Sequence, residues 1–279
     1  MSTTDDQTKT ILLTGASDGI GLETAMRLAA LGHQLLLHGR NEAKLDAAVE
    51  RVRSATPDAT IETHLADLSN LVEVDALAAS VAERHDRLDV LINNAGIFKT
   101  SAPLTADGLD VRFVVNTIAP YRLTTQLLPI VPASGRIVNL SSAAQAPVDR
   151  AAMVGETRLA DMDAYAQSKL AITMWSRHLA EQLGADGPAV IAVNPGSLLA
   201  TKMVKEGFGV AGSDIGIGAD ILVRAALSDE FAAATGRYWD NDSGRFAPPH
   251  PDGLDPARTG VVVDDVARLA ASLAGAGQV

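Results

Sequence analysis

The chain has 279 residues, of which 47% are apolar, so it can bury a large core, and its length suits one sizeable α/β domain. Its formal net charge of -11 at pH 7 argues against nucleic acid or an anionic membrane as partner, because both need clustered Lys and Arg. Because the chain has no cysteine, disulfides, thiolate catalysis and zinc-thiolate sites are excluded.

Targeting and metal-binding signals are also missing from the sequence. The first residues are polar and acidic, and no run of 18 apolar residues occurs, so we expect a cytoplasmic protein with no membrane partner. The six histidines show no spacing typical of metal ligands, and the sequence therefore predicts no metal site.

The first strand, turn and helix predict a dinucleotide site. Residues 10–13 are β-branched or apolar and are expected to form a buried strand, and residues 22–31 have helical spacing. Between them, Gly15, Gly19 and Gly21 would let the backbone turn sharply, approach a pyrophosphate and present helix N–H groups to it.

The same turn also fits the nucleophile-elbow pattern G-x-S-x-G of α/β-hydrolases, with Ser17 at its centre. We reject that interpretation because such an elbow needs several earlier strands, and only nine residues precede Thr10. Ser17 is then a phosphate-loop residue at most.

The rest of the chain alternates strands and helices. Strands are expected at residues 34–38, 60–65, 88–93, 136–140 and 189–193, and helices at 42–53, 71–81, 107–131, 163–183 and 214–227. Continuous apolar strands in this order favour a single-domain α/β fold over residues 1–279, a Rossmann-type doubly wound parallel sheet with helices on both faces. Ligands of such sheets bind at the carboxyl ends of the strands.

Three segments fit this alternation less well. Residues 143–162 contain Pro147 and Gly155 and are expected to form an irregular insertion on the ligand side. Residues 197–230 are interpreted as a substrate loop and helix. A last edge strand is expected at 236–240, and residues 240–279 as a proline-marked extended tail that ends in a short helix from Asp264.

Tyr165 and Lys169 are the clearest candidates for chemistry. They lie four residues apart in a predicted helix, so both side chains are expected on one face. A nearby ammonium favours the phenolate, and lowering a tyrosine pKa from about 10 towards 7 takes about 4 kcal/mol. A tyrosine tuned in this way can exchange a proton near neutral pH.

Six motifs occur in a fixed order along the chain. They are Thr14-Gly-Ala-Ser-Asp-Gly-Ile-Gly21, Asn93-Asn-Ala-Gly96, Asn116, Ser142, Tyr165 with Lys169, and Asn194-Pro-Gly196. In this order and over residues 9–201, the chain resembles the short-chain dehydrogenase/reductase family, in its NADP-preferring branch.

The resemblance implies a catalytic role for each matching residue. Tyr165 would be the general acid in reduction and the base in oxidation, and Ser142 would donate a hydrogen bond to the substrate oxygen. Lys169 would lower the tyrosine pKa and bind the nicotinamide ribose. Asn116 would hold a water for proton supply, or else be a buried polar residue satisfied by the backbone. Ser141 is expected to be structural.

The resemblance also implies NADP as cofactor, with NAD possible. At the end of the second strand, where NAD-binding relatives place a carboxylate, stand Gly39 and then Arg40, whose guanidinium can grip a 2'-phosphate. Asp18 opposes this preference, because many NADP-preferring relatives carry a basic residue there. The expected cofactor-binding residues are Gly15, Ser17, Asp18, Gly19, Ile20, Gly21, Arg40, Asp67, Leu68, Asn94, Ala95, Gly96, Tyr165, Lys169, Pro195, Gly196 and Thr201.

Ser142 and Tyr165 are 23 residues apart, longer than in compact members of the family. With Leu104-Thr-Ala-Asp-Gly-Leu and Tyr165-Ala-Gln-Ser-Lys-Leu-Ala, this separation makes the chain resemble the retinol-dehydrogenase-like subgroup. The substrate is expected to be a small carbonyl or alcohol compound. Apolar residues that favour an apolar pocket are Met153, Val154, Leu198, Leu199, Met203 and Phe208.

A homodimer or homotetramer is expected through the helices at 107–131 and 163–183. The second of these helices has more apolar surface than one core-facing stripe needs, and the extra surface is expected to bind a partner subunit. The residues are Leu170, Met174, Trp175, His178 and Leu179.

Two other functions use the same fold. A non-catalytic NADP sensor would bind the dinucleotide without needing the set Asn116, Ser142, Tyr165 and Lys169. A dehydratase or epimerase would use the same Tyr and Lys pair, but such relatives usually have a larger C-terminal substrate domain.

Overall fold

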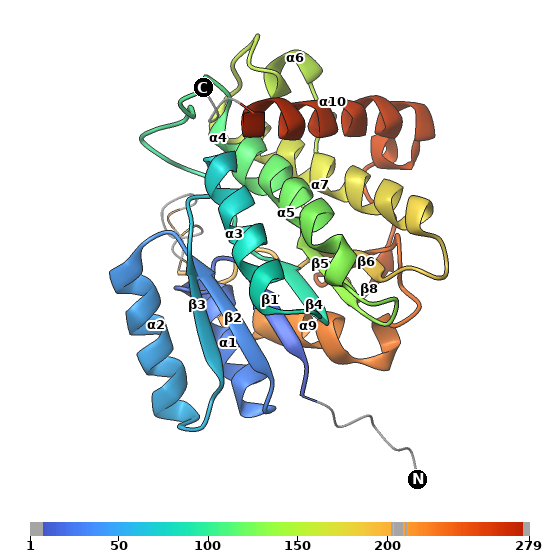
Figure 1. Ribbon diagram of the computed structural model, residues 1–279. Coiled ribbons are helices and arrows are strands. Elements are labelled where there is room, and N and C mark those ends of the chain that lie inside the picture. The colour runs from blue at the N-terminus through green and yellow to red at the C-terminus, as the bar shows by residue number, and fades with distance from the viewer. Residues whose placement is uncertain (1–7, 202, 204–208, 210, 276–279) are drawn as a thin grey trace.

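The computed structural model describes residues 8–201, 203, 209 and 211–275, and its centre is one sheet (Figure 1). The strands are β1 Thr10–Leu13, β2 Gln34–Gly39, β3 Ile61–Leu65, β4 Val90–Asn93, β5 Arg136–Leu140, β6 Ala189–Asn194, β7 Tyr238–Asp240 and β8 Arg245–Ala247. Their order is β3-β2-β1-β4-β5-β6-β7-β8, and every pairing is parallel except β7 with β8. The predicted α/β fold class is confirmed.

Helices cover both faces of this sheet (Figure 1). On one face lie α1 Gly19–Ala30, α2 Glu42–Ala55 and α9 Ile215–Leu227, and on the other lie α3 Leu71–Arg84, α5 Ala119–Leu127 and α7 Asp161–Leu183. In β1, Ile11 and Leu13 pack into the core with α1 and α9, while Leu12 between them packs into the core with α3, α5 and α7. Burial on both faces explains why central strands such as β1 and β6 are mostly apolar.

The chain order reverses between β1 and β4. From β1 the chain builds outward to β2 and β3, then returns to place β4 on the other side of β1. At such a switch point the loops leave the sheet in opposite directions and open a crevice at the carboxyl ends of the strands. The glycine turn after β1 and the residues after β4 lie at this crevice.

The predicted helix at 107–131 is shorter and irregular. It begins with the short α4, Val111–Phe113, passes through a π-helical turn, Val114–Ile118, and continues as α5. Pro120 explains the wide turn, because it has no N–H for the carbonyl of Asn116 and its ring crowds that carbonyl. The N–H of Ala119 instead bonds the Val114 carbonyl, five residues back.

Two predicted irregular segments contain regular structure. The insertion after β5 includes the short helix α6, Arg150–Met153. The expected extended tail is wrong: it forms β8 and a long helix α10, Pro256–Gly275, which begins eight residues before Asp264. Pro256 is the first residue of α10, where a helix needs no N–H, and the Asp255 carboxylate caps it by accepting from the N–H groups of Ala257 and Arg258.

Helix α10 lies across α7, α5 and α3 as an additional layer (Figure 1). The apolar residues expected to face a partner subunit are buried within the chain instead: Leu170, Met174 and Trp175 are no more than 1% exposed. They belong to the same core as Val262 and Val266 of α10. Because α10 already covers these residues of α7, they are no evidence for an oligomer. The homodimer or homotetramer stays a prediction.

Candidate active site

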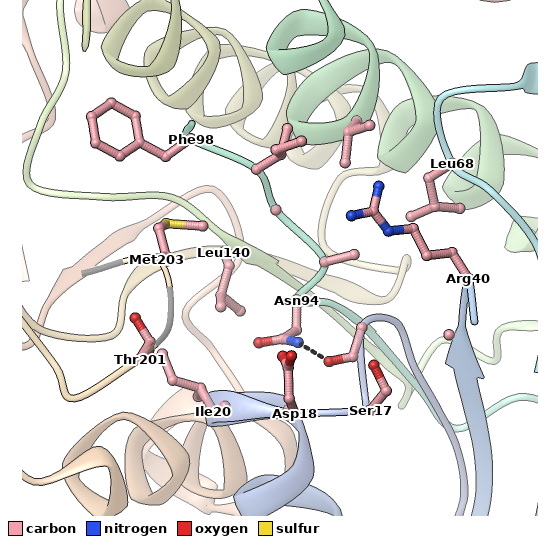
Figure 2. A pocket seen from close by; sticks show the side chains of 18 of the residues that line it. Ser17, Asp18, Ile20, Arg40, Leu68, Asn94, Phe98, Leu140, Thr201 and Met203 are labelled. Atoms are coloured by element: carbon pink, nitrogen blue, oxygen red, sulfur yellow. Dashed lines mark hydrogen bonds between the residues drawn. The ribbon is translucent and has the colours of Figure 1, made fainter. Parts of the chain in front are cut away.

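The glycine turn packs directly against the residues that follow β4. Gly15 has a φ of +66°, and a Cβ added to it would lie 2.8 Å from the Cα of Ala95. A Cβ on Gly21 would lie 2.2 Å from the Gly15 carbonyl oxygen. The Asn94 amide donates to the carbonyls of Thr14 and Gly15, at 2.8 and 3.0 Å, and Figure 2 shows its side chain over the turn. Glycine is thus required at both positions for this close approach.

His38, in β2, holds the same turn from the other side. Its Nδ1 accepts from the Gly15 N–H at 3.3 Å, and its Nε2 donates to the Ala66 carbonyl at 2.9 Å. Since a carbonyl can only accept, Nε2 carries the hydrogen and the ring is neutral. Burial lowers the pKa of His38 to about 4. The sequence shows only that His38 lacks the spacing of a metal ligand, and its support of the dinucleotide turn was not predicted.

A cavity of about 410 Å³ lies at this end of the sheet, and most of the predicted cofactor residues line it. The lining includes Gly15, Ser17, Asp18, Gly19, Ile20, Gly21, Arg40, Asp67, Leu68, Asn94, Ala95, Gly96, Tyr165, Lys169, Pro195 and Thr201. Asn116, Ser142 and Gly196 lie outside this lining. Asn41, Lys44, Phe98 and Lys99 line the cavity but were not predicted.

One end of the cavity carries positive charge. Arg40 follows β2, and Lys44 lies in the first turn of α2, whose N-terminus is capped by the Asn41 side chain accepting from the Lys44 N–H at 3.0 Å. Two cations and a helix N-terminus therefore face the same space, which suits a phosphate. Asp67 also lines this space, and its Oδ1 accepts from the Ser69 amide at 2.9 Å.

Figure 2 shows Arg40 at the opposite end of the cavity from Thr201 and Met203. Asp18 is exposed and does not cap α1 with its side chain. Asp18 lines the cavity, so its carboxylate opposes the binding of an anion near it, and its effect on the cofactor preference stays a prediction.

Tyr165 and Lys169 lie on the inner face of α7, as their spacing predicts. The Lys169 Nζ donates to the Leu140 carbonyl at the end of β5, at 2.8 Å, and lies 5.6 Å from the centre of the Tyr165 ring. Phe98 packs on the other side of the phenol, with ring centres 5.2 Å apart. Burial lowers the pKa of Lys169 to about 8, so a small rise in pH removes its charge.

The Tyr165 pKa departs from our expectation. Burial raises it, and the hydrogen bond with the Ser142 side chain lowers it only in part. We expected the Lys169 ammonium to lower this pKa, but in the structure desolvation of the phenol is the larger effect. A phenol with a raised pKa stays protonated at neutral pH, which suits an acid more than a base.

The two serines after β5 have different surroundings. Ser141 is 3% exposed, and its hydroxyl donates to the Lys169 carbonyl at 3.0 Å and lies 2.7 Å from the Thr173 hydroxyl. Ser142 is partly exposed; its hydroxyl accepts from the Ala144 N–H at 3.1 Å and is near enough to the Tyr165 phenol to lower its pKa. Ser141, and not Ser142, lines the cavity, so the structural role of Ser141 and the catalytic role of Ser142 stay predictions.

The Asn116 side chain is held by bonds within the protein. Its Oδ1 accepts from the Ile97 N–H at 2.8 Å, and its Nδ2 donates to the Ile97 carbonyl and the Ser168 hydroxyl, both at 3.0 Å. It thereby fastens the loop after β4 to α7. A water at Asn116 could bond the backbone carbonyl, for which Pro120 offers no N–H, and its presence stays a prediction.

The predicted apolar substrate pocket is supported by fewer residues than expected. Met203 lines the cavity, whereas Met153 is fully buried in the core and Leu199 is 3% exposed. Leu198 is 47% exposed, and Phe208 lies outside the described residues.

No helix among the described residues is both long and apolar enough to cross a membrane. That finding concerns only the part of the chain that the structure describes.

Comparison with known proteins agrees with this geometry. The family model described as short chain dehydrogenase matches residues 9–208. Human retinol dehydrogenase 13 is 31% identical over 271 residues, which cover 90% of this chain and 81% of the human protein. The match to mouse retinol dehydrogenase 13 covers only 58% of that protein, and the match to mouse retinol dehydrogenase 12 covers 62%.

Two solved structures are similar over most of the chain. An uncharacterised protein from Mycobacterium paratuberculosis has a TM-score of 0.77 and 27% identity, covering 94% of this chain and 93% of that one. The landomycin C-6 ketoreductase LanV, with bound NADP and rabelomycin, has a TM-score of 0.65 and 29% identity, covering 85% of this chain and 95% of that one. The chain therefore belongs to the short-chain dehydrogenase/reductase family of oxidoreductases, in its retinol-dehydrogenase-like subgroup.

Proposed function

We propose that the protein transfers a hydride between NADP(H) and the carbonyl or alcohol carbon of a small, apolar substrate. The observation that carries this proposal is that Tyr165 and Lys169 line one edge of a cavity whose glycine turn allows the close approach of a dinucleotide, with the Ser142 side chain near enough to lower the Tyr165 pKa. The nicotinamide supplies or accepts the hydride when the cofactor is bound.

The protein's own residues move the proton and hold the substrate oxygen. In reduction, Tyr165 donates its phenolic proton to that oxygen as charge develops, and its raised pKa keeps the proton in place until then. Ser142 donates a hydrogen bond to the same oxygen. Lys169 keeps a positive charge below about pH 8, close to the phenol and the expected ribose position.

Arg40 and Lys44 support NADP over NAD, because both line the end of the cavity beside the α2 N-terminus. The ketoreductase LanV, 29% identical, has NADP bound. Arg40→Ala is expected to weaken NADPH binding by about tenfold or more, since charge-assisted hydrogen bonds contribute about 1.5–3 kcal/mol. Arg51→Ala, an exposed arginine further along α2, is the matched control.

The first test combines binding and turnover. NADPH and NADH are titrated against the fluorescence of the two buried tryptophans, Trp175 and Trp239, and NADPH consumption is then followed with a panel of aldehydes and ketones. Tyr165→Phe should keep NADPH binding and lower kcat by roughly a hundredfold or more. Unchanged turnover in this variant would remove Tyr165 from the proposed mechanism.

Two outcomes favour the alternative functions. NADPH binding with no turnover of any carbonyl compound would favour the non-catalytic sensor. Nicotinamide that stays tightly bound and unchanged through turnover would favour a dehydratase or epimerase. Light scattering would test the homodimer or homotetramer, and cell fractionation the expected cytoplasmic location.

A further inference from the structure

The β7–β8 hairpin, residues 238–247, follows the segment that the family model matches, yet it contacts two parts of the active site. It lies beside β6 at the edge of the sheet, with β7 parallel to β6 and β8 returning antiparallel. Aromatic side chains anchor it: the Trp239 ring centre lies 5.1 Å from that of Phe231 and 4.9 Å from that of Phe246. The polar contacts described below are therefore not needed to attach the hairpin.

The first contact reaches the backbone of Ser142. The Tyr238 hydroxyl donates to the Ser142 carbonyl at 3.0 Å, and the Gln145 side-chain amide donates to the same oxygen, also at 3.0 Å. Tyr238 is only 5% exposed, and burial raises its pKa, so its hydroxyl stays a donor throughout the working pH range. Two donors on one carbonyl fix the peptide that carries the Ser142 side chain.

The second contact holds the loop after β6. The Asp242 carboxylate accepts from the Ser197 N–H at 2.8 Å and from the Asn194 amide at 2.9 Å. The neighbouring Asn241 donates from its side chain to the Pro195 carbonyl at 3.0 Å. Pro195 lines the cavity, so the hairpin fixes the loop that forms one wall of the proposed nicotinamide site.

We propose that the β7–β8 hairpin sets the position of Ser142 relative to the Pro195 loop, with Tyr238 and Asp242 as positioning residues for hydride transfer. This inference rests on the proposed function. In the proposed reaction the substrate oxygen would bind to Ser142 and Tyr165, and the carbon that carries this oxygen would lie against the nicotinamide ring beside Pro195. Small errors in this arrangement reduce the rate of hydride transfer more than they reduce substrate binding. A rigid hairpin that bonds both the Ser142 peptide and the loop at Pro195 keeps these two parts of the site at a fixed distance from each other.

The test begins with Tyr238→Phe, which removes only the hydroxyl. With NADPH and 4-nitrobenzaldehyde as the probe, kcat should fall three- to tenfold, while the Kd for NADPH and the thermal midpoint stay close to wild type. Tyr121→Phe is the matched control, because Tyr121 is a half-buried tyrosine of α5 that packs on Trp175 away from the site. A Tyr238→Phe enzyme with the kcat of the Tyr121→Phe control would overturn the proposal.

Asp242→Ala tests the other side of the hairpin. NADPH should bind three- to tenfold more weakly, and the Ser197 N–H should exchange with deuterium faster than in Asp58→Ala, an exposed control in the turn after α2. Equal NADPH affinity and equal exchange in the two variants would contradict the proposal.

Deuterium exchange separates failure of this inference from failure of the proposed function. If wild type does not reduce the probe, exchange at residues 141–146 of Tyr238→Phe still decides whether the hairpin fixes Ser142. Faster exchange there than in Tyr121→Phe supports the positioning role, and unchanged exchange overturns it.

Discussion

Acid should lower the stability of the fold through His38, which holds the dinucleotide turn. The ring is 2% exposed, accepts from the Gly15 N–H and donates to the Ala66 carbonyl, so a second ring hydrogen would point at the Gly15 N–H. Burial lowers the pKa of His38 to about 4, with the neighbouring His64 acting in the same direction and Asp67 opposing it. The folded state therefore favours the neutral ring, and acid should lower the free energy of unfolding.

The magnitude follows from the difference between the two pKa values. Because the pKa in the folded state, about 4, lies below the unfolded value of 6.5, the unfolded chain binds the proton first. The stability from neutral His38 is fully present above about pH 6.5 and is lost as the pH falls towards 4. Between about pH 7.5 and about pH 5 this loss amounts to about 2 kcal/mol.

Urea unfolding at these two pH values measures the effect. His38→Gln, which cannot titrate, should lose about 2 kcal/mol less free energy of unfolding than wild type over this interval. His178→Gln, at a partly exposed position on α7, is the matched control and should follow wild type. The nearby His64 also has a lowered pKa and acts on His38, and it is kept in all three proteins. Parallel pH curves for wild type and His38→Gln would refute the reasoning.

Three further predictions concern buried groups. Asp110→Ala leaves the 1% exposed Arg112 without its principal partner, and urea unfolding should show a loss of about 3 kcal/mol. Because burial lowers the pKa of Lys169 to about 8, kcat for carbonyl reduction should fall as the pH rises through that value; a pH profile that is flat to about pH 10 would contradict the role of its charge. Val266→Asp places a carboxylate in the fully buried contact of α10 with α7, so the thermal midpoint should fall sharply; an unchanged midpoint would show that α10 does not need this contact.

Local sequence patterns were enough to predict the buried strands and the placement of several candidate site residues. Buried strands are continuous apolar runs, and Tyr165 and Lys169 share a helix face because they are four residues apart. The glycine turn, Asn94 and Pro195 come at strand ends, and parallel strands bring their carboxyl ends to one edge of the sheet. Their meeting at one cavity could therefore be predicted without coordinates.

Some local signals were present but were misinterpreted. Pro256 was taken as a sign of extended chain, although a proline after the capping residue Asp255 also begins a helix. Lys44, three residues after the capping Asn41, lies in the first helical turn beside Arg40, and this proximity could have been predicted from the same pattern.

Only the tertiary structure decided the roles of His38, Tyr238 and α10. His38 acts through Gly15 and Ala66, and Tyr238 through Ser142, which lies 96 positions away in the sequence. Helix α10 covers apolar residues of α7 that, by their pattern alone, could equally face a second subunit. These contacts join distant segments, and a residue type in its local sequence does not specify which distant group folding brings against it.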